Sequence, residues 1–255
     1  MIDTAKDKWW QSFYQDTPFI AYLDQAHRED LEPILQFLHG LVSLDKNTHL
    51  FDQCCGVGSV SLPLAAQSVK VTGVDICPQF IDEAKRRAAA LPASTRASYH
   101  LADATEFLPD TACDIAVNLY TSFGYADDSV NQAMLNQAHA SLKAGAPFVL
   151  DYPNMYSILG VFRKHIVKHL ETVSGPITVT RQSTLDHQNG RLLQQWTFIQ
   201  PDGTRTTRNS SLAIYLPHQV KEMLLKAGFE TVALYGGFDG QALSSDSVRC
   251  LAVAR

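Results

Sequence analysis

The chain has little positive charge for its length and no long apolar run. It carries 21 Lys and Arg against 26 Asp and Glu in 255 residues, which gives a formal net charge of −5 and a pI near 6.0. Nucleic-acid binding needs an excess of basic charge on one surface, so a broad nucleic-acid footprint is disfavoured. No window reaches the apolar length that spans a bilayer, and the N-terminus lacks the apolar core of a signal peptide. We therefore expect a cytoplasmic protein without a membrane partner.

Cysteine pairs and metal motifs are also scarce. The count of five cysteines is odd, and Cys54 and Cys55 are adjacent, which makes a disulfide framework implausible. Neither C-x-x-C nor H-E-x-x-H spacing occurs, so we expect no metal. With 255 residues, 45% of them hydrophobic, the chain can bury a large core without such staples.

The two common phosphate-binding glycine motifs are missing from the glycine-rich loop at residues 50–59. An apolar strand start runs into Asp52 and then into Gly56 and Gly58, but the third glycine of G-x-G-x-x-G is absent. G-x-x-x-x-G-K-[ST] is absent as well. A nucleoside with a short amino-acid tail remains, with Asp52 accepting from the ammonium and the glycine backbone running beside the tail. The alternative is a tight strand-to-helix turn that binds nothing.

Acidic residues recur where the following strands should end. Residues 69–75 end in Asp75, which could accept from both hydroxyls of a ribose, and residues 98–104 contain Asp103, which could accept from an adenine amine. A fourth strand, residues 112–119, ends at Asn118. Because parallel strands bring their carboxyl ends to one edge of the sheet, these groups predict an α/β protein with a ligand site along that edge.

These motifs, which span residues 50–125, resemble those of the class I S-adenosylmethionine-dependent methyltransferases. The resemblance implies S-adenosylmethionine as cofactor. It departs from the family at Cys54, where many members carry glycine, and at Gln53, which is polar in a usually apolar position and needs a hydrogen-bond partner if buried. The residues expected to bind the cofactor are Tyr14, Asp52, Cys54, Gly56, Gly58, Asp75, Ile76, Phe80, Asp103, Ala104, Asn118 and Leu119.

The remaining pattern predicts a seven-stranded Rossmann-like methyltransferase sheet, formed by residues 48–154 and 216–255, whose last strand is antiparallel. Residues 1–47 predict a helical lead-in, with Trp10 and Tyr14 as candidates for a lid over the cofactor.

Residues 155–215 predict an insertion into that sheet domain. Apolar spacing favours a helix over 155–170, and three alternating segments follow, separated by turns that contain Asn189-Gly190 and Asp202-Gly203. An inserted antiparallel three-stranded sheet results, either as a substrate roof or as a dimer contact. The basic run at residues 163–169 is interpreted as a solvated helix face.

The insertion is similar to that of small-molecule methyltransferases, among them deoxysugar N-dimethyltransferases and glycine-type N-methyltransferases. This similarity implies a small-molecule acceptor methylated at N or O and a possible homodimer. An RNA or protein methyltransferase and a non-catalytic S-adenosylmethionine-binding module remain as alternatives. No general base is assigned. The residues expected to contact the acceptor are Tyr120, Ser122, Tyr125, Tyr152 and Tyr215.

Overall fold

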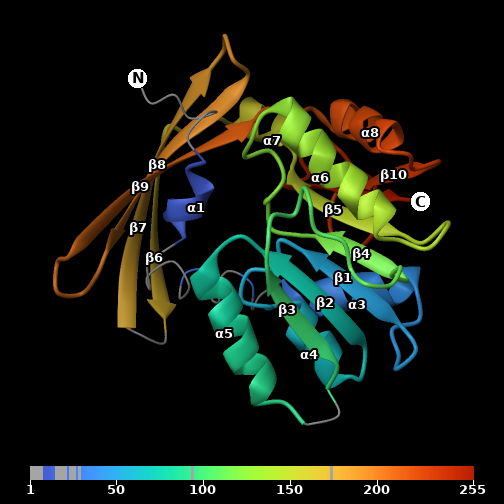
Figure 1. Cartoon of the computed structure of the whole chain (residues 1–255). Helices are drawn as coiled ribbons and strands as arrows, with labels where there is room; N and C mark the ends of the chain where they lie inside the picture. The colour runs from blue at the N-terminus through green and yellow to red at the C-terminus, as the bar shows by residue number, and fades with distance from the viewer. Residues whose placement is uncertain (1–7, 15–21, 23–26, 28–29, 93–94, 173–174) are drawn as a thin grey trace.

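The computed structural model describes residues 8–14, 22, 27, 30–92, 95–172 and 175–255, and contains two separate sheets (Figure 1). The larger sheet has seven strands in the order β10-β11-β5-β4-β1-β2-β3, which confirms the predicted sheet. Its strands are β1 (His49–Gln53), β2 (Lys70–Asp75), β3 (Ala97–Leu101), β4 (Ile115–Asn118), β5 (Phe148–Pro153), β10 (Val232–Tyr235) and β11 (Arg249–Ala254). The first five are parallel, whereas β11 runs antiparallel to both β5 and β10.

Helices cover both faces of the seven-stranded sheet, and its central strands β1 and β4 are therefore buried on both sides. On one face, β1 presents Leu50 to a core that includes Ile34 and Ile81. On the other, β1 presents Phe51 to a core that includes Leu135 and Leu224. The helices of the first face are α3 (Leu31–Leu41), α4 (Ser61–Ala66) and α5 (Pro78–Ala89), and those of the second are α6 (Asp128–Ala140) and α8 (Pro217–Lys226).

The inserted sheet has four strands rather than the predicted three. They are β6 (His165–Thr172), β7 (Gly175–Asp186), β8 (Arg191–Ile199) and β9 (Arg205–Ala213), all antiparallel to their neighbours. The short helix α1 (Trp10–Phe13) lies against this sheet (Figure 1). Its Phe13 packs on Ile177 and Phe198. The N-terminal segment therefore reaches the inserted sheet as well as the larger one.

The prediction of a helix over residues 155–170 is wrong beyond Gly160. Helix α7 (Met155–Gly160) ends at Gly160, and the rest of the segment is the edge strand β6. Ile166 and Leu170 are four residues apart, a spacing that places them on one side of either a helix or a strand. The basic run at 163–169 accordingly lies in part on the exposed edge strand β6 and not on a helix. Charged side chains on an edge strand discourage pairing with a further strand.

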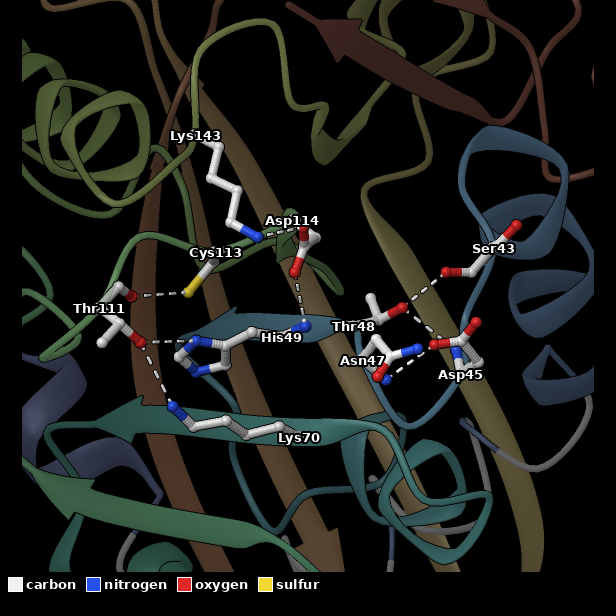
Figure 2. Close-up of polar contacts among 10 residues, drawn as sticks. All are labelled: Ser43, Asp45, Asn47, Thr48, His49, Lys70, Thr111, Cys113, Asp114 and Lys143. Carbon is white, nitrogen blue, oxygen red and sulfur yellow. Dashed lines mark hydrogen bonds and ion pairs between the residues drawn. The ribbon is translucent and has the colours of Figure 1, made fainter.

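A buried histidine ties β1 to its neighbours at the amino end of the sheet (Figure 2). The His49 ring contacts the Thr72 hydroxyl through Nε2 at 2.8 Å and the Thr111 hydroxyl through Nδ1 at 3.2 Å. Its backbone N–H donates to Asp114, which also pairs with Lys143. Burial and the neighbouring Lys70 charge lower the pKa of His49 from 6.5 to about 4, so the ring is neutral near pH 7.

This histidine gives a first prediction about stability. Between pH 6.5 and about 4 the unfolded chain binds a proton at His49 and the folded chain does not, so the free energy of unfolding falls as the pH falls. From pH 6.5 to 5 the wild type should lose up to about 2 kcal/mol more than His49→Gln. Urea denaturation at several pH values measures this difference, with the exposed-site variant His187→Gln as the control. Parallel curves for His49→Gln and wild type would show that the ring takes up its proton as readily in the folded state as in the unfolded chain.

Candidate functional site

A cavity of about 470 Å³ lies over the carboxyl ends of β1, β2 and β4. This volume is within the range of small-molecule sites. Of the residues predicted to bind cofactor or acceptor, those that line it are Tyr14, Asp52, Cys54, Gly56, Asp75, Ile76, Phe80, Asp103, Ala104, Leu119, Tyr120, Ser122 and Tyr125. The motifs spread over residues 50–125 therefore meet around one space.

The loop after β1 turns sharply because three of its residues have left-handed backbone: Cys54, Gly56 and Gly58, with φ of 62°, 54° and 77°. Gly58 is also crowded, because a Cβ there would lie 2.9 Å from the Tyr99 hydroxyl oxygen. Gly58 therefore shapes the turn without lining the cavity. Cys54 adopts its conformation although left-handed backbone costs a non-glycine residue about 1–2 kcal/mol.

Asp75 joins the loop after β1 to the loop after β2. Its Oδ2 accepts from the Gly56 N–H at 2.9 Å and its Oδ1 from the Cys77 N–H at 2.8 Å. Burial raises the pKa of Asp75, and the two backbone donors oppose that shift. The carboxylate is thereby fixed at the cavity wall, and each oxygen keeps a lone pair for a ligand hydroxyl.

Gln53 and Asn118 form a buried support beneath the loop rather than part of the cavity wall. Both are fully buried. Gln53 accepts from the Asn118 amide at 3.0 Å and donates to the carbonyls of Ala104 and Met134. The polar residue at position 53 therefore has its partners, and Asn118, predicted to contact the cofactor, instead positions residues that do line the cavity.

Asp52 faces the cavity from the end of β1 and is only 5% exposed. Burial raises its pKa to about 7, and the nearby Asp75 charge adds to this shift. An ammonium group placed beside Asp52 would favour the ionised carboxylate and release a proton. Asp52 is thus suited to a cationic part of a ligand.

This gives a second prediction, on binding. Affinity for S-adenosylhomocysteine, whose amino-acid tail carries an ammonium, should rise between pH 6 and pH 7 by up to about tenfold and level off above pH 7. Asp52→Asn should flatten that dependence, whereas Asp202→Asn, on the surface, should leave it unchanged. Calorimetry in buffers of different ionisation enthalpy measures the released proton directly. A dependence equally steep in Asp52→Asn would assign the proton to another group.

Tyr14 and Tyr125 close the side of the cavity that faces the inserted sheet, and Phe80 packs beside Tyr14. The Tyr14 ring lies 5.4 Å from Phe80 and 6.4 Å from Tyr125, centroid to centroid, and the two tyrosine hydroxyls are hydrogen-bonded. Burial raises the pKa of both tyrosines, so neither ionises near neutral pH. Trp10 also lines the cavity, so both lid candidates from the N-terminal segment border it.

A second cavity, of about 670 Å³, lies between this aromatic wall and the inserted sheet. It shares Tyr14, His27, Tyr120 and Tyr125 with the first cavity. Its remaining wall includes residues of β7, β8 and β9 and of the segment 157–166, with Asp151, Pro153 and Arg249 on the side of the larger sheet. The insertion therefore roofs a space that adjoins the first cavity.

The segment after β4 separates the two cavities under conformational constraint. Tyr120 and Thr121 both have left-handed backbone, with φ of 60° and 66°. The Tyr120 N–H donates to Asp151 at 3.0 Å, and Asp151 is itself ion-paired with Arg249. Left-handed non-glycine backbone persists only where surrounding contacts impose it, and these contacts do so.

Two tyrosines predicted to contact the acceptor lie elsewhere. Tyr152 and Tyr215 are buried beside Phe123 in the core of the larger sheet, outside both cavities. Tyr152 donates to the Ala213 carbonyl, which ties β5 to the end of β9. Aromatic residues next to a site are equally suited to packing, and the sequence could not distinguish the two uses.

The sequence interpretation did not single out several residues that line the first cavity: Lys8, His27, Cys55, Ser59, Val60, Thr105, Glu106, Ala126, Asp127, Val130, Asn131 and Met134. His27 borders both cavities, and its ring is stacked on that of Tyr120 with 3.6 Å between the ring centroids. It lies far from the motifs along the chain, so no local signal marked it. Thr105 could have been found, since it follows Asp103 by two residues and donates to it through its backbone N–H and its hydroxyl.

Within the described residues, no group of three His, Cys, Asp or Glu side chains is arranged to hold a metal ion. In the same part of the chain, no helix combines the length and apolar character needed to cross a bilayer.

Residues 50–145 match the family described as a methyltransferase domain. The CcbJ methyltransferase from Streptomyces caelestis superposes with a TM-score of 0.75 at 19% identity, over 88% of each chain. The sugar N-methyltransferase KedS8 from Streptoalloteichus superposes with a TM-score of 0.71 at 17% identity, over 94% of this chain and 92% of that one. An uncharacterized RNA methyltransferase of Bacillus cereus is 44% identical over 66 residues, 26% of this chain and 14% of that protein. The chain thus spans about a seventh of the length of that relative.

Residues 50–145 thus match a methyltransferase domain, and the chain has the fold of solved S-adenosylmethionine-dependent methyltransferases. The residues of the first cavity fit that cofactor. Asp75 offers oxygens suited to ribose hydroxyls, Asp52 a carboxylate for the ammonium, and the Gly56 turn a close backbone approach. The buried Ser59 hydroxyl, which lines the cavity without a hydrogen-bond partner, is a further donor available to the ligand.

Proposed function

We propose that this protein transfers a methyl group from S-adenosylmethionine to a small molecule, at nitrogen or oxygen. The observation that carries the proposal is the pair of adjoining cavities that share Tyr14, His27, Tyr120 and Tyr125. The first has the groups expected for the cofactor, and the second, about 670 Å³ in volume, is of a size suited to a small-molecule acceptor. The shared residues are where donor and acceptor would meet.

S-adenosylmethionine, when bound, supplies a methyl group activated by attachment to a sulfonium. The task of the protein is then mainly to orient the acceptor, since alignment alone can contribute several kcal/mol to such a reaction. The rings of Tyr14, Tyr120 and Tyr125 border the place of transfer, and aromatic faces also stabilise cations. Asp151 accepts from the Tyr120 N–H and is itself bound by Arg249, which fixes the position of Tyr120.

An RNA acceptor is the second candidate, favoured by the RNA methyltransferase of Bacillus cereus among the relatives. That similarity covers 66 residues, whereas the similarity to the sugar N-methyltransferase KedS8 extends over 94% of the chain, which takes in the inserted sheet. The net charge of −5 also supports a small acceptor over a polyanion.

Incubation with S-adenosylmethionine bearing a deuterated methyl group tests the proposal. The protein is mixed with a metabolite extract or with bulk tRNA, and both fractions are analysed by mass spectrometry. We expect a metabolite that gains one labelled methyl with wild type and with Asp82→Asn, an exposed-site control, and far less label with Asp75→Ala. Label in tRNA together with none in metabolites would replace the proposal by the RNA alternative. Label in neither fraction, with cofactor binding intact, would favour a non-catalytic module.

A further inference from the structure

The second cavity contains polar groups that the folded chain leaves without partners. The Nε of Arg181, the hydroxyl of Ser183 and the indole N–H of Trp9 are all buried and make no hydrogen bond in the described part of the chain. All three residues line this cavity. Buried donors without partners each cost about 1–3 kcal/mol, and such sites normally await a ligand or water.

Arg181 differs in this respect from the other buried or half-buried arginines around the insertion. Arg249 is ion-paired with Asp151 at 2.6 Å and with Asp30. Arg191 is bonded to the carbonyls of Tyr125 and Ala126. Arg181 has no ion pair with a carboxylate among the described residues. The ring of Trp196, 5.1 Å from its guanidinium carbon, and the neighbouring Tyr22 favour its charged form. Burial lowers the pKa of its guanidinium, as expected for a cation removed from water without a counter-ion.

Arg181 and Ser183 lie on the same face of β7, two residues apart, at a separation of about 7 Å along the strand. The residues opposite them on the neighbouring strand β8, Trp196 and Gln194, also line the cavity. A group with several acceptor oxygens and a negative charge would satisfy the guanidinium and the hydroxyl together, since charge-assisted hydrogen bonds are the stronger kind. A neutral apolar ligand would leave both unsatisfied.

We infer that the acceptor carries an anionic group, a carboxylate or a phosphate, that binds between Arg181 and Ser183 in the second cavity. The inference rests on the proposed function, because it takes this cavity for the acceptor site. The second cavity also has an excess of negative charge on one side and positive charge on the other. The pair Asp30 and Asp151 outnumbers Arg249 on the side of the larger sheet, while Arg163 and Arg181 supply positive charge on the side of the insertion. An acceptor held by its anionic end at Arg181 would extend its other end toward Tyr120 and the first cavity.

Calorimetric titration with matched aromatic probes tests the anion site separately from methyl transfer. The probes are benzoate, phenyl phosphate and the neutral benzamide, each titrated with and without S-adenosylhomocysteine. We expect at least one anion to bind wild type about tenfold or more tightly than benzamide. A preference for benzoate identifies a carboxylate site and a preference for phenyl phosphate a phosphate site; either supports the inference. Equal binding of all three, or no binding of either anion, would overturn it.

Variants assign the effect to Arg181. Arg181→Gln should weaken anion binding about tenfold and leave benzamide unchanged, Arg181→Lys should restore part of the loss, and Ser183→Ala should cost a smaller factor. Arg205→Gln removes one exposed arginine from β9 outside the cavity and should change nothing. Because Arg181 is buried without a counter-ion, Arg181→Gln should melt no lower than wild type. A lower melting temperature, or unchanged anion affinity, would mean that Arg181 serves the fold and not the ligand.

Titration with S-adenosylhomocysteine alone distinguishes a failure of the anion site from a failure of the proposed function. If it binds and the anions do not, the anion site is refuted while the cofactor site stands. If the anions bind and S-adenosylhomocysteine does not, the proposed function fails, although the anion site exists.

Discussion

Asp75→Ala is expected to weaken binding of S-adenosylhomocysteine by on the order of 100-fold. The substitution removes a carboxylate suited to accept from two ribose hydroxyls, and charge-assisted hydrogen bonds contribute about 1.5–3 kcal/mol each. It also removes the acceptor for the Gly56 and Cys77 N–H groups, which hold the two cofactor loops together. Calorimetric titration gives the dissociation constants.

Two further variants decide how that loss arises. Asp75→Asn keeps an oxygen acceptor but loses the charge, so its affinity should fall between that of wild type and that of Asp75→Ala. Asp82→Ala, which removes an exposed carboxylate from the neighbouring helix α5, should bind as wild type does. Unchanged affinity in Asp75→Ala would show that the ribose binds elsewhere.

Arg191→Met is expected to lower the free energy of unfolding by about 3 kcal/mol. The Arg191 side chain is 7% exposed and donates to the Ser211 hydroxyl at 2.7 Å, to the Ala126 carbonyl at 2.8 Å and to the Tyr125 carbonyl at 2.6 Å. Methionine fills a similar volume but removes the donor from the Ser211 hydroxyl and the Tyr125 carbonyl, whereas the Ala126 carbonyl keeps the Asn131 amide as a donor. Urea denaturation measures the loss.

The same variant should also loosen the segment that carries Tyr125, which lines both cavities. Affinity for S-adenosylhomocysteine should therefore fall, but by less than in Asp75→Ala. Arg205→Met, on the exposed part of β9, serves as the matched control and should retain both stability and affinity. A stable Arg191→Met protein would show that the inserted sheet is held in place without this arginine.

The cofactor side of the site was predictable because its chemistry is local in sequence. Asp52, Asp75 and Asp103 lie at or just beyond the carboxyl ends of β1, β2 and β3, and parallel strands bring such positions to one edge. Gly56 and Gly58 mark the turn because the backbone there is left-handed. These features depend on residue identity and strand direction, which a single sequence contains.

The acceptor side was less predictable because it depends on how distant segments pack. Residues 166–170 allow either a helix or a strand, and pairing with β7 decides in favour of β6. Tyr152 and Asn118 stand at strand ends like the residues of the site, yet both are buried beneath it. His27 and Arg181 border the second cavity only because the N-terminal segment and the insertion come together there.

A crystal structure of the protein with S-adenosylhomocysteine tests the central claim most directly. The two-cavity arrangement predicts the ribose hydroxyls within hydrogen-bonding distance of the Asp75 carboxylate and the ammonium beside Asp52. It also predicts the sulfur directed toward Tyr14 and Tyr125, with the second cavity open beyond them. S-adenosylhomocysteine bound with its sulfur directed away from the second cavity, or in a different part of the protein, would contradict the assignment of the two cavities to donor and acceptor.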